Sequence, residues 1–298
     1  MTPAHQLTLN LSGRLVSLEK PLVMGIVNVT PDSFFAGSRI DGAKALRERL
    51  DMLVREGAAL ADLGAYSSRS GAEEVSPEEE RRRLRPALQI LRDEYPNLPV
   101  SVDTFRSDVA RMAVEEYGAA VINDISGGGL DPAMYRTMAE LQVPYILMHM
   151  KGDPKTMQQQ ASYSDVTLEV IDYFAQRVGQ LLELGVHDII LDPGFGFSKT
   201  TAQNYELLAQ LGSLVEAFTQ PLLVGVSRKS MIYRPLGITP EEALSGTTFV
   251  HALALERGAK ILRVHDVRPA VEAVQLYEEL RPFLRSDGAL HYQHLRPL

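Results

Sequence analysis

Long apolar runs that alternate with stretches of helical character dominate the pattern of hydrophobic and polar positions. Eight of these runs are nearly continuous in apolar residues, whereas half-exposed strands would alternate between apolar and polar. The runs therefore predict eight parallel strands buried on both faces: Leu22–Val29, Ala58–Gly64, Val100–Thr104, Ala119–Ile125, Tyr145–His149, Ile189–Pro193, Leu222–Ser227 and Ile261–His265.

The segments between these runs carry signals for the starts and ends of helices. Ser76, with Pro77 next and Glu79 three residues on, predicts a capping box at a helix start. Glycines stand where four helices should end, each just before a predicted strand: Gly57, Gly118, Gly185 and Gly258. Strand and helix in eight rounds favour an α/β fold, a (β/α)₈ TIM barrel, over a doubly wound sheet.

The N-terminal stretch has a different pattern from the rest. Residues His5 to Leu18 predict a short β-hairpin around Ser12-Gly13. With no linker, low-complexity tract or short repeat further along, we expect a hairpin extension over residues 1–20. We expect a single barrel domain over residues 21–290.

Composition and charge exclude several classes of function. The formal net charge of −8 argues against a nucleic-acid surface. Glu78-Glu79-Glu80 and Arg81-Arg82-Arg83 are adjacent, which predicts a solvated helix face. No apolar run reaches the roughly 20 residues of a membrane span, and Met1 to Gln6 lacks a secretory pattern. With no Cys, disulfides and thiolate ligands are excluded, and a cytoplasmic location is expected.

Polar residues close nearly every predicted strand. An isolated Asp or Asn after a strand is more often a cap or turn residue, and a lone His there is more often structural. That explanation weakens when all strands share the feature, because the carboxyl ends of barrel strands meet at one face where active sites form. The residues are Asn28, Asp62, Asp103, Asn123, Asp124, His149, Asp192, Ser227, Arg228, Lys229, Arg263 and His265.

Two groups can be separated by their chemistry. The first has acceptors and donors suited to a flat heterocycle with many polar edges, namely Asp103, Asn123, Asp192 and Lys229. The second is rich in cations and donors and suits a phosphate or pyrophosphate: Asn28, Arg69, Arg263 and His265. Small-residue loops at 30–33 and 67–71 are of the kind that close over a site.

The motifs that contain these residues resemble, in order, those of the dihydropteroate synthases. The resemblance runs from about Val23 to Val267, nearly the whole chain. A lone Asp-Pro-Gly is a weak signal, but the ordered set is specific. It comprises Asn28-Val29-Thr30-Pro31-Asp32-Ser33-Phe34, Ser67-Ser68-Arg69, Gly71-Ala72, Asp103-Thr104, Asn123-Asp124-Ile125, Asp192-Pro193-Gly194-Phe195-Gly196-Phe197, Ser227-Arg228-Lys229-Ser230 and Arg263-Val264-His265-Asp266.

The resemblance implies a transferase of folate biosynthesis. Such an enzyme joins para-aminobenzoate to hydroxymethyl-dihydropterin pyrophosphate, releases pyrophosphate, and is the target of sulfonamides. It also implies Mg²⁺ as cofactor, a homodimer formed through the late helices, small-molecule substrates, and no nucleic-acid or membrane partner.

The resemblance also implies roles for particular residues. The pterin pocket would comprise Asp103, Asn123, Asp192 and Lys229, with Arg263 stacking on the ring. Pyrophosphate would bind Asn28, Arg69, Arg263 and His265, with Asn28 near Mg²⁺. Aminobenzoate would contact Phe34, Ser68, Ser70, Phe197, Lys229 and Ser230. The residues expected to act on the reacting groups are Asp32, Asp103, Lys229 and Arg263.

Four positions depart from the family pattern. Ser70 replaces the usual Pro, Ala36 the more frequent Asp, and Ala65 the usual Gly, while Ser198 precedes Lys199 in place of a smaller residue. Ser is looser than Pro and removes an apolar contact. We therefore expect retained activity with a modified aminobenzoate pocket.

Two other functions are compatible with parts of the pattern. A pterin-binding methyltransferase that moves a methyl group from methyltetrahydrofolate to a corrinoid would share the Asp/Asn/Asp pocket. It would need neither the motif at 28–33 nor the Ser-Arg-Lys-Ser motif. A degenerate synthase homologue would bind pterin without turnover, which a turnover assay distinguishes.

Overall fold

Eight parallel strands close into a barrel, as the sequence predicts. The computed structural model describes residues 7–29, 39–66, 75–154 and 156–284. In barrel order the strands are β10 (Ala259–Val264), β3 (Leu22–Asn28), β4 (Leu60–Gly64), β5 (Val100–Asp103), β6 (Val121–Asp124), β7 (Tyr145–Met148), β8 (Ile189–Asp192) and β9 (Leu222–Val224).

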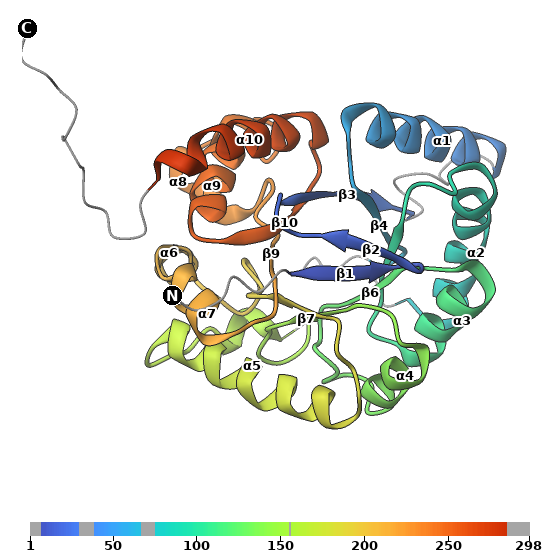
Figure 1. Cartoon of the computed structure of the whole chain (residues 1–298), viewed down its shortest axis with the longest axis horizontal. Coiled ribbons are helices and arrows are strands. Elements are labelled where there is room, and N and C mark those ends of the chain that lie inside the picture. Colours follow the sequence, from blue (N-terminus) through green and yellow to red (C-terminus); the bar gives the residue numbers. More distant parts are fainter. Residues whose placement is uncertain (1–6, 30–38, 67–74, 155, 285–298) are drawn as a thin grey trace, which may run out of the picture.

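Helices surround this barrel, as Figure 1 shows down its axis. In chain order they are α1 (Arg39–Glu56), α2 (Pro77–Glu94), α3 (Ser107–Tyr117), α4 (Met134–Leu141), α5 (Val166–Glu183), α6 (Thr201–Ala209), α7 (Leu211–Ala217), α8 (Ser230–Leu236), α9 (Leu244–Glu256) and α10 (Val267–Leu280). Short 3-10 turns occur at η2 (Met157–Gln160) and η3 (Arg281–Phe283). No helix in the described ranges is both long enough and apolar enough to cross a membrane.

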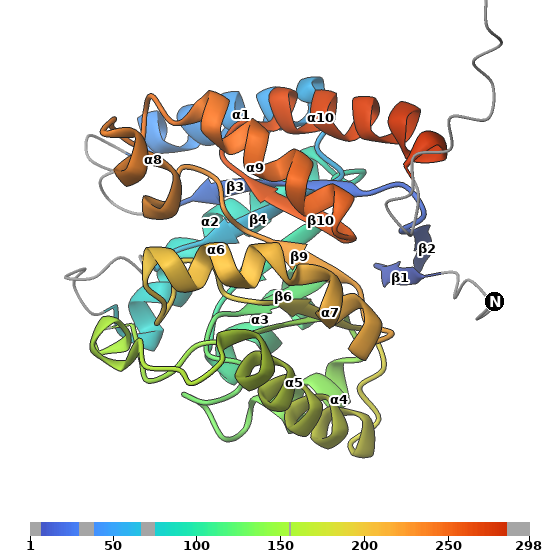
Figure 2. The same cartoon turned by 90° about the vertical axis from the view of Figure 1, so that its left-hand side faces the viewer.

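The predicted hairpin is present and covers one end of the barrel. Strands β1 (Thr8–Leu11) and β2 (Arg14–Ser17) pair antiparallel across Ser12-Gly13, both of which have positive φ, as a tight two-residue turn requires. Leu9, Leu11 and Leu18 pack against residues inside the barrel. Figure 2 shows this hairpin at the opposite end of the molecule from α8. The hairpin closes this end of the barrel with apolar side chains, and the polar residues at the carboxyl ends of the strands lie at the other end.

Glycines end helices as predicted, with left-handed backbone angles. Gly57, Gly118, Gly185 and Gly258 have φ of 88°, 73°, 84° and 96°, which residues with a Cβ rarely adopt. The capping box at Ser76 is only half right. The Ser76 hydroxyl accepts from the Glu79 amide at 3.2 Å, but the Glu79 carboxylate pairs with Arg82 and Arg83.

The strands are shorter than the apolar runs that predict them. For example, the ladder of β9 ends at Val224, whereas the run was expected to reach Ser227. The chain leaves the ladder at Gly225 and turns through Arg228, which has a φ of 55°. This turn brings Lys229 back over the mouth of the barrel.

Candidate active site

The polar strand ends converge, as the barrel topology requires. Strand pairing sets Asn28 beside Gly64, Gly64 beside Asp103, and Asp103 beside Asn123. Further round, Met148 pairs with Asp192. The side chains predicted to form one mouth therefore do so, although they come from strands far apart in the sequence.

A connected network of charges and amides occupies the middle of this mouth. Arg263, on β10, donates from Nε to Asp62 Oδ2 at 2.6 Å and from Nη2 to Asp103 Oδ2 at 3.1 Å. The Asn123 amide donates to both oxygens of Asp62, at 3.3 and 3.2 Å. Asp62 is fully buried, and a buried charge is unfavourable unless it is paired. Arg263 and Asn123 supply the pairing. Asp103 keeps 18% of its side chain exposed and faces the opening.

Burial changes the ionisation of Asp103. The pKa of this carboxyl is raised to about 7 by burial, with Arg263 lowering it and Asp62 raising it. With this pKa, both the protonated and the ionised form of Asp103 are accessible near neutral pH. A group of this kind is able both to accept from a ring N–H and to change charge when a ligand binds.

Asp192 and Lys229 form the second part of the mouth. Burial raises the pKa of Asp192, opposed mainly by the charge of Lys229. Burial lowers the pKa of Lys229 to about 8, and Asp192 opposes that shift. The Lys229 ammonium donates to the Phe195 carbonyl and lies 4.7 Å from the centre of the Phe197 ring. Lys229 is therefore held between a carbonyl, a ring and a carboxylate.

Gly225 separates Lys229 from Arg263. A Cβ at Gly225 would lie 3.9 Å from both Lys229 Nζ and Arg263 Cβ, so the two cationic side chains flank the same stretch of backbone. Beside them, Ile125, Met148, Met150 and Met157 form a buried apolar cluster, against which Phe105 and Phe197 pack. The mouth thus combines polar edges with apolar faces, as a flat aromatic ligand requires.

His265 follows β10 and is held by Ser227. Its ring Nδ1 lies 3.1 Å from the Ser227 hydroxyl, which also accepts from the His265 amide at 3.2 Å. Burial, with the neighbouring Arg263 and Arg228 charges, lowers the pKa of His265 to about 4. The sequence places His265 in a group rich in cations, but near neutral pH its imidazole is uncharged, with one ring nitrogen as a donor and the other as an acceptor.

Two further arginines fix the backbone of this region. Arg228 forms a bidentate pair with Asp266, at 2.8 and 2.6 Å, which holds the turn that carries Lys229. Arg49 on α1 donates to the carbonyls of Ile26 and His265, at 2.9 and 2.8 Å. Both arginines tie neighbouring strand ends together.

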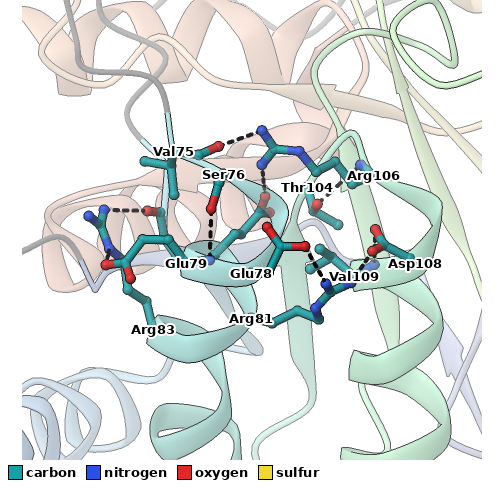
Figure 3. A network of polar contacts seen from close by, with 12 residues as sticks. Val75, Ser76, Glu78, Glu79, Arg81, Arg83, Thr104, Arg106, Asp108 and Val109 are labelled. Atoms are coloured by element: carbon teal, nitrogen blue, oxygen red, sulfur yellow. Dashed lines mark hydrogen bonds and ion pairs between the residues drawn. The ribbon is translucent and has the colours of Figure 1, made fainter.

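Ionic contacts also hold the segments that border residues 67–74, as Figure 3 shows. Arg106 donates to the Val75 carbonyl at 2.6 Å and pairs with Glu80. Arg83 donates to the Ala65 carbonyl at 3.3 Å and pairs with Glu79. Glu80 is 1% exposed, so the prediction of a solvated helix face is wrong for this residue. The missed partner is Arg106, which stands 26 residues further along the chain.

Several predicted residues lie outside the described ranges, namely Asp32, Phe34, Ala36, Ser68, Arg69 and Ser70. The others lie at the mouth: Asn28, exposed at the end of β3; Asp103, Asn123 and Asp192 at strand ends; Phe197 and Lys229 in the loops; Ser230, the first residue of α8; and Arg263 and His265. Asp124 instead has a structural environment. It accepts from Ser126, Gly128 and Tyr145.

Sequence reasoning assigns no role to two residues of this region. Asp62 is counted among the polar residues of the strands but is placed in neither group, although a carboxylate in the middle of an apolar run is itself a signal for a buried partner. The second residue is Lys199, which is 3% exposed and contacts His149. Lys199 stands outside the apolar runs, so the sequence gives no sign that it is buried.

Comparison with known proteins agrees with this geometry. The family described as pterin binding enzyme matches residues 24–265. The dihydropteroate synthase of Escherichia coli (strain K12) is 41% identical over 268 residues, covering 89% of this chain and 94% of that protein. That of Synechocystis sp. is 41% identical over 265 residues, covering 88% and 91%.

Solved structures agree as well. The Xanthomonas albilineans dihydropteroate synthase with 4-aminobenzoic acid has a TM-score of 0.84 at 41% identity, covering 92% of this chain and 98% of that one. The Yersinia pestis enzyme in a sulfonamide complex has a TM-score of 0.86 at 37% identity, covering 93% and 100%. The chain therefore belongs to the pterin binding enzyme family and, within it, to the dihydropteroate synthases.

Proposed function

We propose that the mouth of this barrel condenses hydroxymethyl-dihydropterin pyrophosphate with para-aminobenzoate to give dihydropteroate and pyrophosphate. The observation that carries the proposal is the Asp62–Arg263–Asp103 network, with Asn123 on one side and the Asp192–Lys229 pair on the other. Relatives with 4-aminobenzoic acid and with 7,8-dihydropteroate bound support the choice of substrates.

The pterin would bind deepest, among Asp103, Asn123, Asp192 and Lys229. Carboxylates accept from ring N–H and exocyclic amino groups, while the amide and ammonium donate to ring nitrogen and carbonyl oxygen. Arg263 would stack its guanidinium on the ring, because its Nε and Nη2 contacts hold that plane in place.

Pyrophosphate would bind at the outer edge, with Asn28, Arg69, Arg263 and His265. The neutral His265 ring would donate from Nε2, since Nδ1 lies against Ser227. Arg263 would then touch both halves of the same substrate, and its salt bridges limit how far it can follow the leaving group.

Mg²⁺ would be held chiefly by the substrate. Within the described ranges, no three His, Asp or Glu side chains are grouped closely enough to hold a metal. Asn28 offers one exposed side chain, and Mg²⁺ commonly combines one or two protein oxygens with phosphate oxygens and water. The residues therefore fit an ion that arrives with pyrophosphate, and when bound it would neutralise charge on that group.

Aminobenzoate would stand above the pterin, against Phe197, Lys229 and Ser230, with Phe34, Ser68 and Ser70 on the two loops. The Phe197 ring is already fixed by the Lys229 ammonium at 4.7 Å. Asp32 would act near the reacting carbon, from the first loop.

The reaction exchanges one bond at the pterin methylene carbon. The carbon–oxygen bond breaks, and pyrophosphate leaves with the bonding electrons. The carboxylates of Asp103 and Asp192 favour the positive charge that develops on the pterin. The lone pair of the neutral aniline nitrogen forms the new carbon–nitrogen bond, and that nitrogen then releases a proton to solvent or pyrophosphate. Since the amine is nucleophilic without activation, no nucleophile–base pair is required of the protein.

A homodimer through the late helices is part of the proposal. Helices α8, α9 and α10 lie together on one side of the molecule (Figure 1). Four apolar side chains on these helices and Phe283 in the adjoining η3 are each more than half exposed, the four being Leu236, Phe249, Leu276 and Leu280. Burial of apolar surface of this kind against a second copy is favourable at about 25 cal/mol per Å². Sedimentation should give a dimer, and Phe249→Glu should give monomers. A cytoplasmic location stays a prediction.

The division of the site into pterin and aminobenzoate halves is tested by steady-state kinetics. Asp103→Ala should abolish use of the pterin substrate, whereas Phe197→Ala should raise mainly the KM for aminobenzoate. Equal effects of the two variants on both substrates would contradict the assignment of these residues.

A further inference from the structure

Lys199, between β8 and α6, is a buried cation that none of the proposed steps uses. The residue is 3% exposed. Its Nζ lies 2.9 Å from His149 Nδ1, 3.1 Å from the Gly194 carbonyl and 3.2 Å from the Phe197 carbonyl. The three acceptors equal the three protons of an ammonium group, so every donor of Lys199 has a partner.

The hydrogen bonds of Lys199 also bear on which ring nitrogen of His149 carries the proton. Both carbonyls can only accept, so Lys199 must donate to them, and the acceptors around Nζ favour the ammonium form. With Lys199 as the ammonium, His149 Nδ1 accepts, and the ring proton is on Nε2. Burial, followed by the charge of Lys199, lowers the pKa of His149 well below its usual value, in agreement with a neutral ring. For Lys199, burial lowers the pKa to about 7, against the opposing charge of Asp192.

Lys199 and His149 connect the tight turn at Gly194–Phe197 to the end of the neighbouring strand β7. Within the turn, the Phe197 amide donates to the Gly194 carbonyl at 3.1 Å. Gly194 has a φ of 70°, and a Cβ there would overlap the His149 carbonyl oxygen. The turn starts at the site itself, because the Gly194 amide donates to Asp192 Oδ1 at 2.8 Å.

The other side of the same turn holds Lys229 and the aromatic face. Its Phe195 carbonyl accepts from Lys229, and its Phe197 ring lies against the Lys229 ammonium. A displacement of the turn would therefore move the surface expected to contact aminobenzoate. Asp103, Asn123 and Arg263 form no hydrogen bond with Lys199, whose partners are His149 and the Gly194 and Phe197 carbonyls, and they should stay in place.

We propose that Lys199 and His149 are positioning residues that hold the Gly194–Phe197 turn, and through it Phe197 and Lys229, in the geometry required to bind aminobenzoate. This inference rests on the proposed function, and it assigns a role to two side chains that would touch neither substrate.

Steady-state kinetics of Lys199→Met in the full chain test the inference. Met keeps the apolar stem and removes all three donors. Without these three hydrogen bonds the turn loses its attachment to the neighbouring strand end, so the KM for aminobenzoate should rise about tenfold or more. The KM for the pterin substrate should rise much less, because Asp103, Asn123 and Arg263 keep their contacts although Lys229 moves with the turn.

Lys151→Met is the matched control. Lys151 is a neighbouring lysine that pairs with Glu169 and lies over Tyr163, while its ammonium does not contact the turn. The same substitution there should leave both KM values unchanged. Two variants of His149 separate position from folding: His149→Asn keeps an acceptor close to Nδ1 and should be mild, whereas His149→Leu removes it and should follow Lys199→Met.

A double-mutant cycle decides whether the effect passes through the aromatic ring. In a Phe197→Ala background, Lys199→Met should raise the KM for aminobenzoate less than it does in the wild-type chain, because only the effect through Lys229 remains. A full additive effect in that background would overturn the inference. So would an unchanged KM for aminobenzoate in Lys199→Met, or an equal rise for both substrates. A wild-type chain that makes no dihydropteroate would contradict the proposed function instead, which keeps the two failures distinct.

Discussion

Removal of Arg263 should move the pH dependence of pterin binding upward. Arg263 Nη2 lies 3.1 Å from Asp103 Oδ2, and its charge opposes the burial that raises the pKa of Asp103 to about 7. An opposite charge this close lowers a carboxyl pKa by about one to three. Removing that charge should therefore raise the pKa of Asp103 further in Arg263→Met.

The sign follows from which form binds. The pterin donates N–H to an ionised carboxylate, so affinity should rise with pH through the pKa of Asp103 and then level off. At a fixed pH near neutrality, the ionised fraction of Asp103 should therefore fall in Arg263→Met. The apparent affinity should fall with it, by up to about tenfold for each pH unit by which the midpoint moves, and the pH-dependent part of the loss should be recovered in more alkaline solution.

Calorimetric titration with 6-hydroxymethyl-7,8-dihydropterin, from pH 6 to 9.5, measures this midpoint. The probe lacks pyrophosphate, so the second expected role of Arg263 does not interfere, and loss of stacking lowers affinity equally at all pH values. Asp62→Asn is the matched variant of opposite sign, because the Asp62 charge raises the pKa of Asp103. Its midpoint should fall below the wild-type value. Midpoints that stay at the wild-type pH, or that move in the same direction in both variants, would refute the reasoning.

Three further outcomes are expected. Turnover should decline above about pH 8, where the Lys229 ammonium loses its proton. Lys229→Arg should remove this decline from a profile of kcat/KM against pH, and a decline that persists in the variant would belong to another group. Arg106→Met should lower the free energy of unfolding in urea by about 3–5 kcal/mol, because it leaves the Glu80 carboxylate buried without its ion pair. Adding Glu80→Gln should restore most of that free energy, and no recovery in the double variant would contradict this cause. Ser70→Pro should lower the KM for aminobenzoate and leave the pterin KM unchanged, as initial rates against each substrate would reveal.

The fold could be predicted because its signals are local. Continuous apolar runs mark strands buried on both faces, and glycines with positive φ mark helix ends. The strand limits were inaccurate, and only the Ser76 half of the predicted capping box is present. The apolar run near Leu222 continues beyond Val224, where the ladder ends, because the residues that follow are buried in a turn over the mouth.

The site could be predicted as far as topology determines it. Once eight parallel strands are expected, the residues at their carboxyl ends must meet, and the convergence of Asp103, Asn123 and Asp192 follows. Pairings set by barrel closure could not be predicted in the same way. Asp62 and Arg263 are 201 residues apart, and only the closing contact of β10 with β3 brings them together.

Charge patterns along one helix were similarly incomplete. Glu80 belongs to a run of acidic residues that would be solvated on an isolated helix. Its burial depends on Arg106, just before α3, which supplies the compensating charge. Lys199 is a comparable case, since it is a buried cation only because the turn surrounds it and His149, which follows β7, lies against its ammonium.

The most direct measurement of the central claim is product formation by the purified chain. Hydroxymethyl-dihydropterin pyrophosphate, para-aminobenzoate and Mg²⁺ should give dihydropteroate and pyrophosphate in equal amounts, and Asp103→Ala should give neither. Binding of the pterin substrate by the wild-type chain without any dihydropteroate, in the presence of both other components, would contradict the claim.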